Sequence, residues 1–168
     1  MKTINRFKYN PCYSIVKYVP VKTSGRIRFD TSNLGGSVIV MGSAPHTVFM
    51  EIHILTKDNQ PKQGRAVFEV IFYASKISVD TIIKWTNSTI PIFAGLPGFC
   101  NKKFMINKEA KTFSGRYEWE TVELAQNYAQ SFAAKLMAQV SKPFPIKYTI
   151  TDKETNEVVV SEKNLERS

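Results

Sequence analysis

The alternation of apolar and polar residues becomes regular after residue 65, where it predicts four β-strands. The strands are expected at residues 66–74, 99–106, 112–120 and 146–151. Their side chains follow a period of two, and β-branched and aromatic residues are frequent in them. Polar, turn-forming residues at 107–111 join the second strand to the third. These four segments predict an antiparallel sheet.

Two segments between these strands have the period of three to four residues that is typical of amphipathic helices. The first follows Ser78, a suitable N-cap, and Pro91 is expected to mark its end. The second follows Thr121 and has one apolar stripe that runs from Leu124 to Val140. The resulting order, β-α-β-β-α-β, predicts an α+β fold of the ferredoxin-like type.

Residues 1–60 are expected to form a β-rich N-terminal extension of a domain that covers residues 61–168. The pattern is irregular through residue 45, where we expect one or two short strands. A clearer strand is expected at Thr47–Leu55. The polar segment 57–64 is rich in turn-forming residues and marks the boundary.

The first strand of the domain predicts that both faces of the sheet are buried. In residues 66–73 every residue except Glu69 is apolar or aromatic. The third strand adds the large side chains of Tyr117 and Trp119. Two helices cover one face, so the second face requires either the N-terminal extension or another subunit. We expect a homodimer, with the extension adding to the coverage.

The formal net charge of +9 is concentrated in the first 29 residues, which carry seven Lys or Arg and no Asp or Glu. Three interpretations stay open: a solvated arm, an organelle-targeting leader, or a contact for a polyanion such as nucleic acid. Pro11, Pro20 and many β-forming residues count against the amphipathic helix of a targeting leader. No nucleic-acid-binding motif accompanies the charge, so the polyanion interpretation rests on charge alone.

Apolar runs in the sequence are short. None reaches the roughly 18 residues that span a bilayer, and the N-terminus lacks the apolar core of a secretory signal. We therefore expect no membrane partner and a cytoplasmic location, or an organellar matrix if the basic N-terminus is a targeting leader.

The sequence contains no standard metal or cofactor motif. Cys12 and Cys100 are expected to be free thiols, and the spacing of His46 and His53 matches no zinc pattern. There is no Gly-rich phosphate loop and no nucleophile elbow. We expect no metal and no cofactor, and phosphoryl transfer and serine hydrolysis are disfavoured.

Three groups of residues occur in a fixed order in the second half of the chain. Pro97-Gly98-Phe99 is followed by Lys102. The third strand has the pattern G-x-Y-x-aromatic, formed by Gly115, Tyr117 and Trp119. The second helix has the spacing A-x-x-Y-x-x-x-x-x-A-x-L, formed by Ala125, Tyr128, Ala134 and Leu136. Together these residues resemble the YdhR-like monooxygenase family of the dimeric α/β-barrel superfamily.

The resemblance covers about residues 66–150. It implies a homodimer whose two sheets form a dimeric α/β barrel, with a pocket in each subunit between the sheet and the helices. The superfamily includes cofactor-independent monooxygenases, isomerases, haem-degrading enzymes and inactive binding proteins. Haem-degrading members use a helical His as the iron ligand, and neither predicted helix contains one, so that activity is disfavoured. Cys100 and Asn101 replace a bulky apolar residue of the family, which implies an altered pocket or interface.

Oxygenation without a cofactor requires a base or hydrogen-bond donors in a dry pocket. The candidate catalytic residues are Tyr117, Glu69 and His53. The candidate pocket residues are Tyr73, Trp85, Asn87, Trp119 and Phe132. Each has a structural alternative: the aromatic side chains can be core, Asn87 a cap, His53 a surface histidine, and Glu69 the partner of Arg116 in an ion pair.

The leading hypothesis is a protein that binds a small apolar or aromatic molecule, and the resemblance implies cofactor-independent monooxygenation of that molecule. The alternative is a non-catalytic binding or assembly module whose basic arm contacts a partner or polyanion. A pocket of about 300 Å³ or more beside the sheet, with a titratable group inside it, would favour the enzyme.

Overall fold

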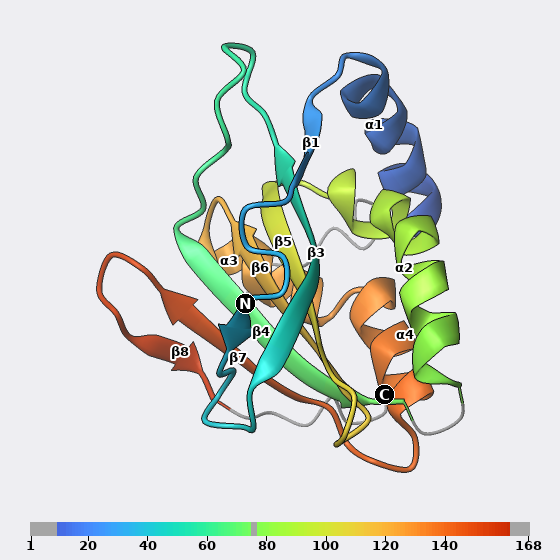
Figure 1. The fold of residues 1–168 in the computed structure, drawn as a ribbon. Coiled ribbons are helices and arrows are strands. Elements are labelled where there is room, and N and C mark those ends of the chain that lie inside the picture. Colours follow the sequence, from blue (N-terminus) through green and yellow to red (C-terminus); the bar gives the residue numbers. More distant parts are fainter. Residues whose placement is uncertain (1–9, 75–76, 162–168) are drawn as a thin grey trace.

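The computed structural model describes residues 10–74 and 77–161, which form an antiparallel sheet with helices packed against one face (Figure 1). In chain order the elements are α1 (Pro11–Thr23), β1 (Ile27–Asp30), β2 (Ser37–Val38), β3 (His46–Ile54), β4 (Ala66–Tyr73), α2 (Val79–Ala94), β5 (Phe99–Asn107), β6 (Thr112–Trp119), α3 (Val122–Ala129), α4 (Phe132–Ser141), β7 (Lys147–Asp152) and β8 (Val158–Val160).

The four strands predicted from the alternation lie at the centre of the sheet in the order β5-β6-β4-β7. This is the ferredoxin-like order, in which the first and third strands of the motif are central and the second and fourth flank them. The predicted α+β fold is therefore confirmed. The sheet of the single chain is open and does not close into a barrel, so the barrel formed by two chains stays a prediction.

Residues from the N-terminal third widen this sheet beyond the ferredoxin-like core. The predicted strand at Thr47–Leu55 is confirmed as β3, which pairs with β5 from Thr47↔Ile106 to His53↔Asn101. The short strands β1 and β2 pair with β3. At the opposite edge of the sheet β8 pairs with β7.

The helix α1 differs from the irregular or extended structure expected for this segment. Asn10 caps it, with its side-chain oxygen accepting a hydrogen bond from the amide of Cys12 at 2.9 Å, and Pro11 occupies the first turn, where no amide donor is needed. Ser14 is buried against α2, and its hydroxyl donates to the carbonyl oxygen of Pro91 at 2.8 Å. Tertiary packing thus supports a helix whose sequence alone is a poor helix former. The basic residues before Asn10 lie outside the described residues.

The other helices differ from expectation at their ends. Helix α2 begins at the predicted cap, Ser78, but continues through Pro91 to Ala94. The single helix expected after Thr121 is two helices, because Ser131 accepts a hydrogen bond from the amide of Ala134 and so caps a new helix, α4. Figure 1 shows α2 and α4 standing together on one side of the sheet.

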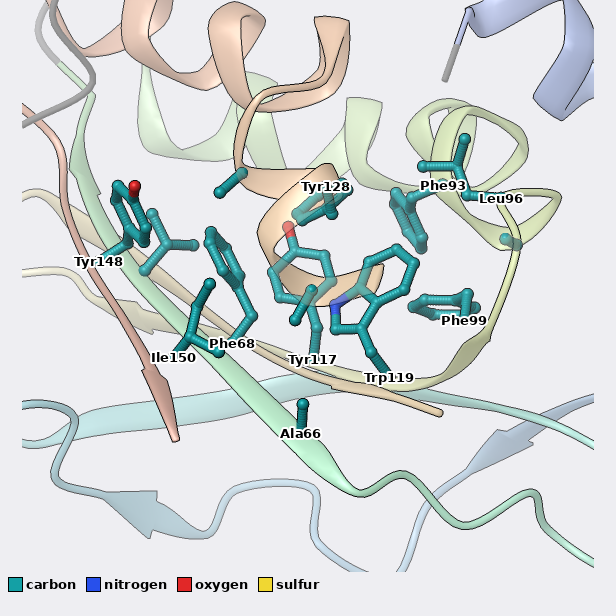
Figure 2. Close-up of a cluster of buried hydrophobic side chains, with 14 of the residues drawn as sticks. Ala66, Phe68, Phe93, Leu96, Phe99, Tyr117, Trp119, Tyr128, Tyr148 and Ile150 are labelled. Carbon is teal, nitrogen blue, oxygen red and sulfur yellow. The ribbon is translucent and has the colours of Figure 1, made fainter. Parts of the chain in front are cut away.

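The main core lies between the sheet and these helices, and aromatic rings from several elements meet there (Figure 2). Phe68 of β4 is fully buried, and its ring centroid lies 5.4 Å from that of Tyr117 and 5.2 Å from that of Tyr128. Trp119 is also fully buried and lies 4.8 Å from Tyr128 by ring centroids. Tyr128 therefore packs α3 against the sheet.

The face of the sheet that points away from the helices is covered in part by the chain itself. Val40, which follows β2, is fully buried and packs against three apolar residues of β3, β4 and β5: Val48, Ile71 and Met105. The N-terminal extension thus supplies some of the expected coverage, and the homodimer stays a prediction. None of the helices in the described ranges has the length and apolar character needed to cross a membrane.

Candidate functional site

A cavity of about 220 Å³ lies between the sheet and helices α2 and α4. Most of its lining is apolar, with side chains from β3 through β6 forming the floor. Trp85 of α2 and Leu136 of α4 also line it, and these side chains are 57% and 40% exposed, so the cavity reaches the surface between the two helices. The volume is below the roughly 300 Å³ that would favour an enzyme, and it suits a ligand of one or two rings.

Lys102 of β5 brings an amine to this apolar cavity. The residue is only 7% exposed, and its Nζ lies 3.8 Å from the ring centroid of Phe104 and 4.3 Å from those of Phe93 and Tyr117. All three rings also line the cavity. Burial lowers the pKa of the Lys102 amine well below its ordinary value, because the charged form loses its hydration. Attraction between the ammonium and the rings opposes part of this effect.

Tyr117 of β6 lies opposite Lys102 in the sheet and lines the same cavity. Its ring occupies space beside Gly115, where an added Cβ would lie 2.6 Å from a ring carbon, so glycine permits this position. Its hydroxyl donates to Sδ of Met137 at 3.7 Å. Burial raises the pKa of the Tyr117 phenol, and burial likewise raises the pKa of the neighbouring Tyr128 phenol. Tyr117 is therefore a hydrogen-bond donor at neutral pH rather than a base.

The structure brings Tyr117 and Trp85, of the candidate site residues, to the cavity. Trp119 is instead fully buried in the core, and the ring of Tyr73 packs against Phe144, with 4.8 Å between ring centroids. Two further candidates, Asn87 and Phe132, are exposed and lie outside the cavity lining.

Glu69 lies on the opposite face of the sheet from the cavity, since it alternates with core residues of β4. Its Oε1 lies 3.3 Å from Nη1 of Arg116, which is the ion pair considered as the structural alternative. Burial raises the pKa of the Glu69 carboxyl, and the nearby Arg116 only partly opposes this.

His53 also lies on this opposite face, in β3. Its Nε2 lies 2.9 Å from Oε1 of Glu51, and Asn33 donates to the other carboxylate oxygen of Glu51 at 2.8 Å. Nδ1 of His53 is buried without a hydrogen-bond partner among the described residues. The sheet separates both Glu69 and His53 from the cavity, and catalytic roles for these residues stay predictions.

Lys102 was not among the candidate site residues, although the sequence contains a signal for it. Lys102 shares a strand face with Phe104 and Ile106, because side chains alternate along a strand, and both of these are buried. A lysine on the apolar face of a strand is the pattern that predicts a buried amine.

Metal-binding side chains do not gather in the described part of the chain: no group of three His, Cys, Asp or Glu residues there is arranged to hold an ion. Cys12 is exposed and Cys100 is buried, and both are free thiols.

Comparison with known proteins finds similarity among solved structures. No family model matches the chain, and no curated protein matches it. One solved structure that it resembles is an uncharacterized ferredoxin-fold protein from Listeria monocytogenes 4b F2365, described as related to antibiotic biosynthesis monooxygenases. The two are 10% identical, the match covers 74% of this chain and 89% of the other, and the TM-score is 0.47. Membership of the YdhR-like family stays a prediction, and function has to be argued from the cavity.

Proposed function

We propose that this protein binds a small aromatic or apolar molecule in the cavity between the sheet and helices α2 and α4. The observation that carries the proposal is the cavity itself, which is lined by apolar side chains and reaches the surface beside Trp85. Pockets for small molecules are concave and mostly apolar, with a few polar groups that orient the ligand. Lys102 and Tyr117 are polar groups of this kind.

Oxygenation without a cofactor is the reaction proposed for this cavity. A carbon acid such as an anthrone loses a proton to the Lys102 amine, the basic group among the described residues that line the cavity, and becomes a carbanion that reacts with oxygen. One oxygen atom replaces the two hydrogens of the methylene group as a carbonyl, and the other leaves with those hydrogens as water. The Tyr117 phenol supports this proposal because it keeps its proton at neutral pH and can donate to the developing oxyanion.

Oxygen uptake with anthrone-like and quinol substrates tests the reaction, measured above the rate without protein. Tyr117→Phe is expected to lower kcat about 10-fold or more, because one donor to a developing charge is lost. Tyr148→Phe is the matched control, since Tyr148 is a buried tyrosine of β7 outside the cavity lining. If no substrate raises oxygen uptake while aromatic ligands still bind, the protein is a non-catalytic binding module.

The homodimer is a second part of the proposal. Support comes from apolar side chains in and after β1 that are exposed in the single chain, namely Phe29, Leu34 and Ile39, at 55%, 44% and 64%. Association of two chains would remove such side chains from water.

A further inference from the structure

Lys102 is an exception among the buried charged residues of the described chain. Glu51 is 3% exposed and contacts Lys103 and His53, and Asp152 is 6% exposed and receives hydrogen bonds from Arg65. Buried charges normally have such partners. Lys102 has no carboxylate partner within the described ranges, and none of the residues found to line the cavity is Asp or Glu.

Within the described part of the chain, the amine therefore lies among rings without an anion to neutralise it. Three aromatic rings surround Nζ with centroids at 3.8 to 4.3 Å, and they compensate a charge only in part. The other titratable groups that line the cavity are the phenols of Tyr117 and Tyr128, and burial keeps both of them neutral. The cavity thus offers one basic group in otherwise apolar surroundings.

We infer that the Lys102 amine binds an acidic oxygen of an aromatic ligand, so that the cavity selects flat molecules of one or two rings that carry a single carboxylate or similarly ionised group. This inference rests on the proposed function, because it concerns the same cavity. The rings of Phe93 and Phe104 contact the aromatic body, and the amine fixes the end that carries the charge. A ligand anion supplies the partner that the amine lacks, so part of the cost of burying the amine is recovered on binding.

Calorimetric titration with 2-naphthoate and 2-naphthamide tests the inference, since the two molecules have nearly the same shape and differ in charge. The wild-type chain is expected to bind 2-naphthoate about 10- to 100-fold more tightly, because a hydrogen bond to a charged group contributes a difference in affinity of this size. Lys102→Met keeps an unbranched side chain and removes the amine. The variant is expected to bind 2-naphthamide as the wild type does and to lose the preference for 2-naphthoate.

Lys103→Met is the matched control. Its amine belongs to the same strand but lies 3.7 Å from Glu51 on the other face of the sheet, so this variant is expected to keep the preference. Binding of both ligands with equal affinity by the wild type would overturn the role of Lys102 and leave the proposed cavity intact. The same holds if Lys102→Met keeps the preference for 2-naphthoate. Failure of the wild type to bind either ligand would overturn the proposed function itself. The wild-type comparison needs no variant, so it holds even if Lys102→Met folds poorly.

Discussion

Replacing Lys102 by methionine is expected to stabilise the free protein, because the substitution removes a buried amine that has no acidic partner among residues 10–74 and 77–161. In the unfolded chain this amine is protonated at pH 7, whereas burial disfavours the protonated form in the folded chain. Each pH unit below the ordinary lysine pKa of about 10.4 contributes about 1.4 kcal/mol, which sets a ceiling of about 4–5 kcal/mol at pH 7. Attraction to three rings recovers about 2 kcal/mol of this when the amine is charged. We expect Lys102→Met to raise the free energy of unfolding by about 2–3 kcal/mol.

The sign of the pH dependence provides a second check. The folded-state pKa of Lys102 is lowered, so between that value and about 10.4 the unfolded wild-type chain binds more protons than the folded chain. The free energy of unfolding of the wild type therefore rises relative to that of the variant as the pH rises. The difference between the two free energies is expected to vanish near pH 10. Urea unfolding of both proteins at pH 7, 8, 9 and 10 measures it, with Lys103→Met as the control that gains no stability. A Lys102→Met variant that is no more stable than the wild type at pH 7, or a difference that stays constant with pH, would refute the reasoning.

Three further predictions concern the core, the thiols and the assembly. Phe68→Ala is expected to lower the free energy of unfolding by about 3–5 kcal/mol in urea unfolding, because Phe68 is fully buried among aromatic rings. Phe132→Ala, at a half-exposed position, is expected to lower it by about 1 kcal/mol or less. Iodoacetamide at pH 8 is expected to modify Cys12 alone in the native chain, since Cys100 is buried and burial raises the pKa of its thiol to about 12. Mass spectrometry that finds two modified thiols before unfolding would contradict this. Sedimentation of the full chain at micromolar concentration is expected to give the mass of two chains, and the mass of one chain would contradict the homodimer.

The central strands were predictable because their signal is local. Each carries a period-two pattern between turn-forming residues, and their order along the chain with two helices leaves few arrangements of the sheet. Helix α1 was not predictable in this way. Its proline residues and β-forming residues disfavour a helix, and what stabilises it is contact with α2, including the hydrogen bond from Ser14 to the carbonyl of Pro91. A contact between residues so far apart in the sequence leaves no pattern in either segment.

At the site, the types of residue were predictable from the sequence, but the positions of their side chains were not. Aromatic side chains and a phenol in a pocket were expected, and Tyr117 and Trp85 do line the cavity. Which other aromatic residues reach it depends on the packing of α4 and β7, and Tyr73 and Phe132 face elsewhere. Lys102 was not predicted to belong to the site because lysine is usually a surface residue, and only its place in the alternation of β5 indicates a buried position.

The pairing of β3 with β5 has a consequence for any shortened form of this protein. In the ferredoxin-like core the second strand is an edge strand, and here β5 runs for nine residues with β3 along one side. Removing residues 1–60 would leave the amide and carbonyl groups on that side without their hydrogen-bond partners, and long unpaired edges recruit strands from other molecules. The full chain instead ends this side of the sheet with β1, which is four residues long and carries Arg28 and Asp30. The N-terminal third thus covers an edge that could otherwise pair with other chains and aggregate. If a shortened chain associates, the cause would be the exposed edge of β5 and not the native assembly.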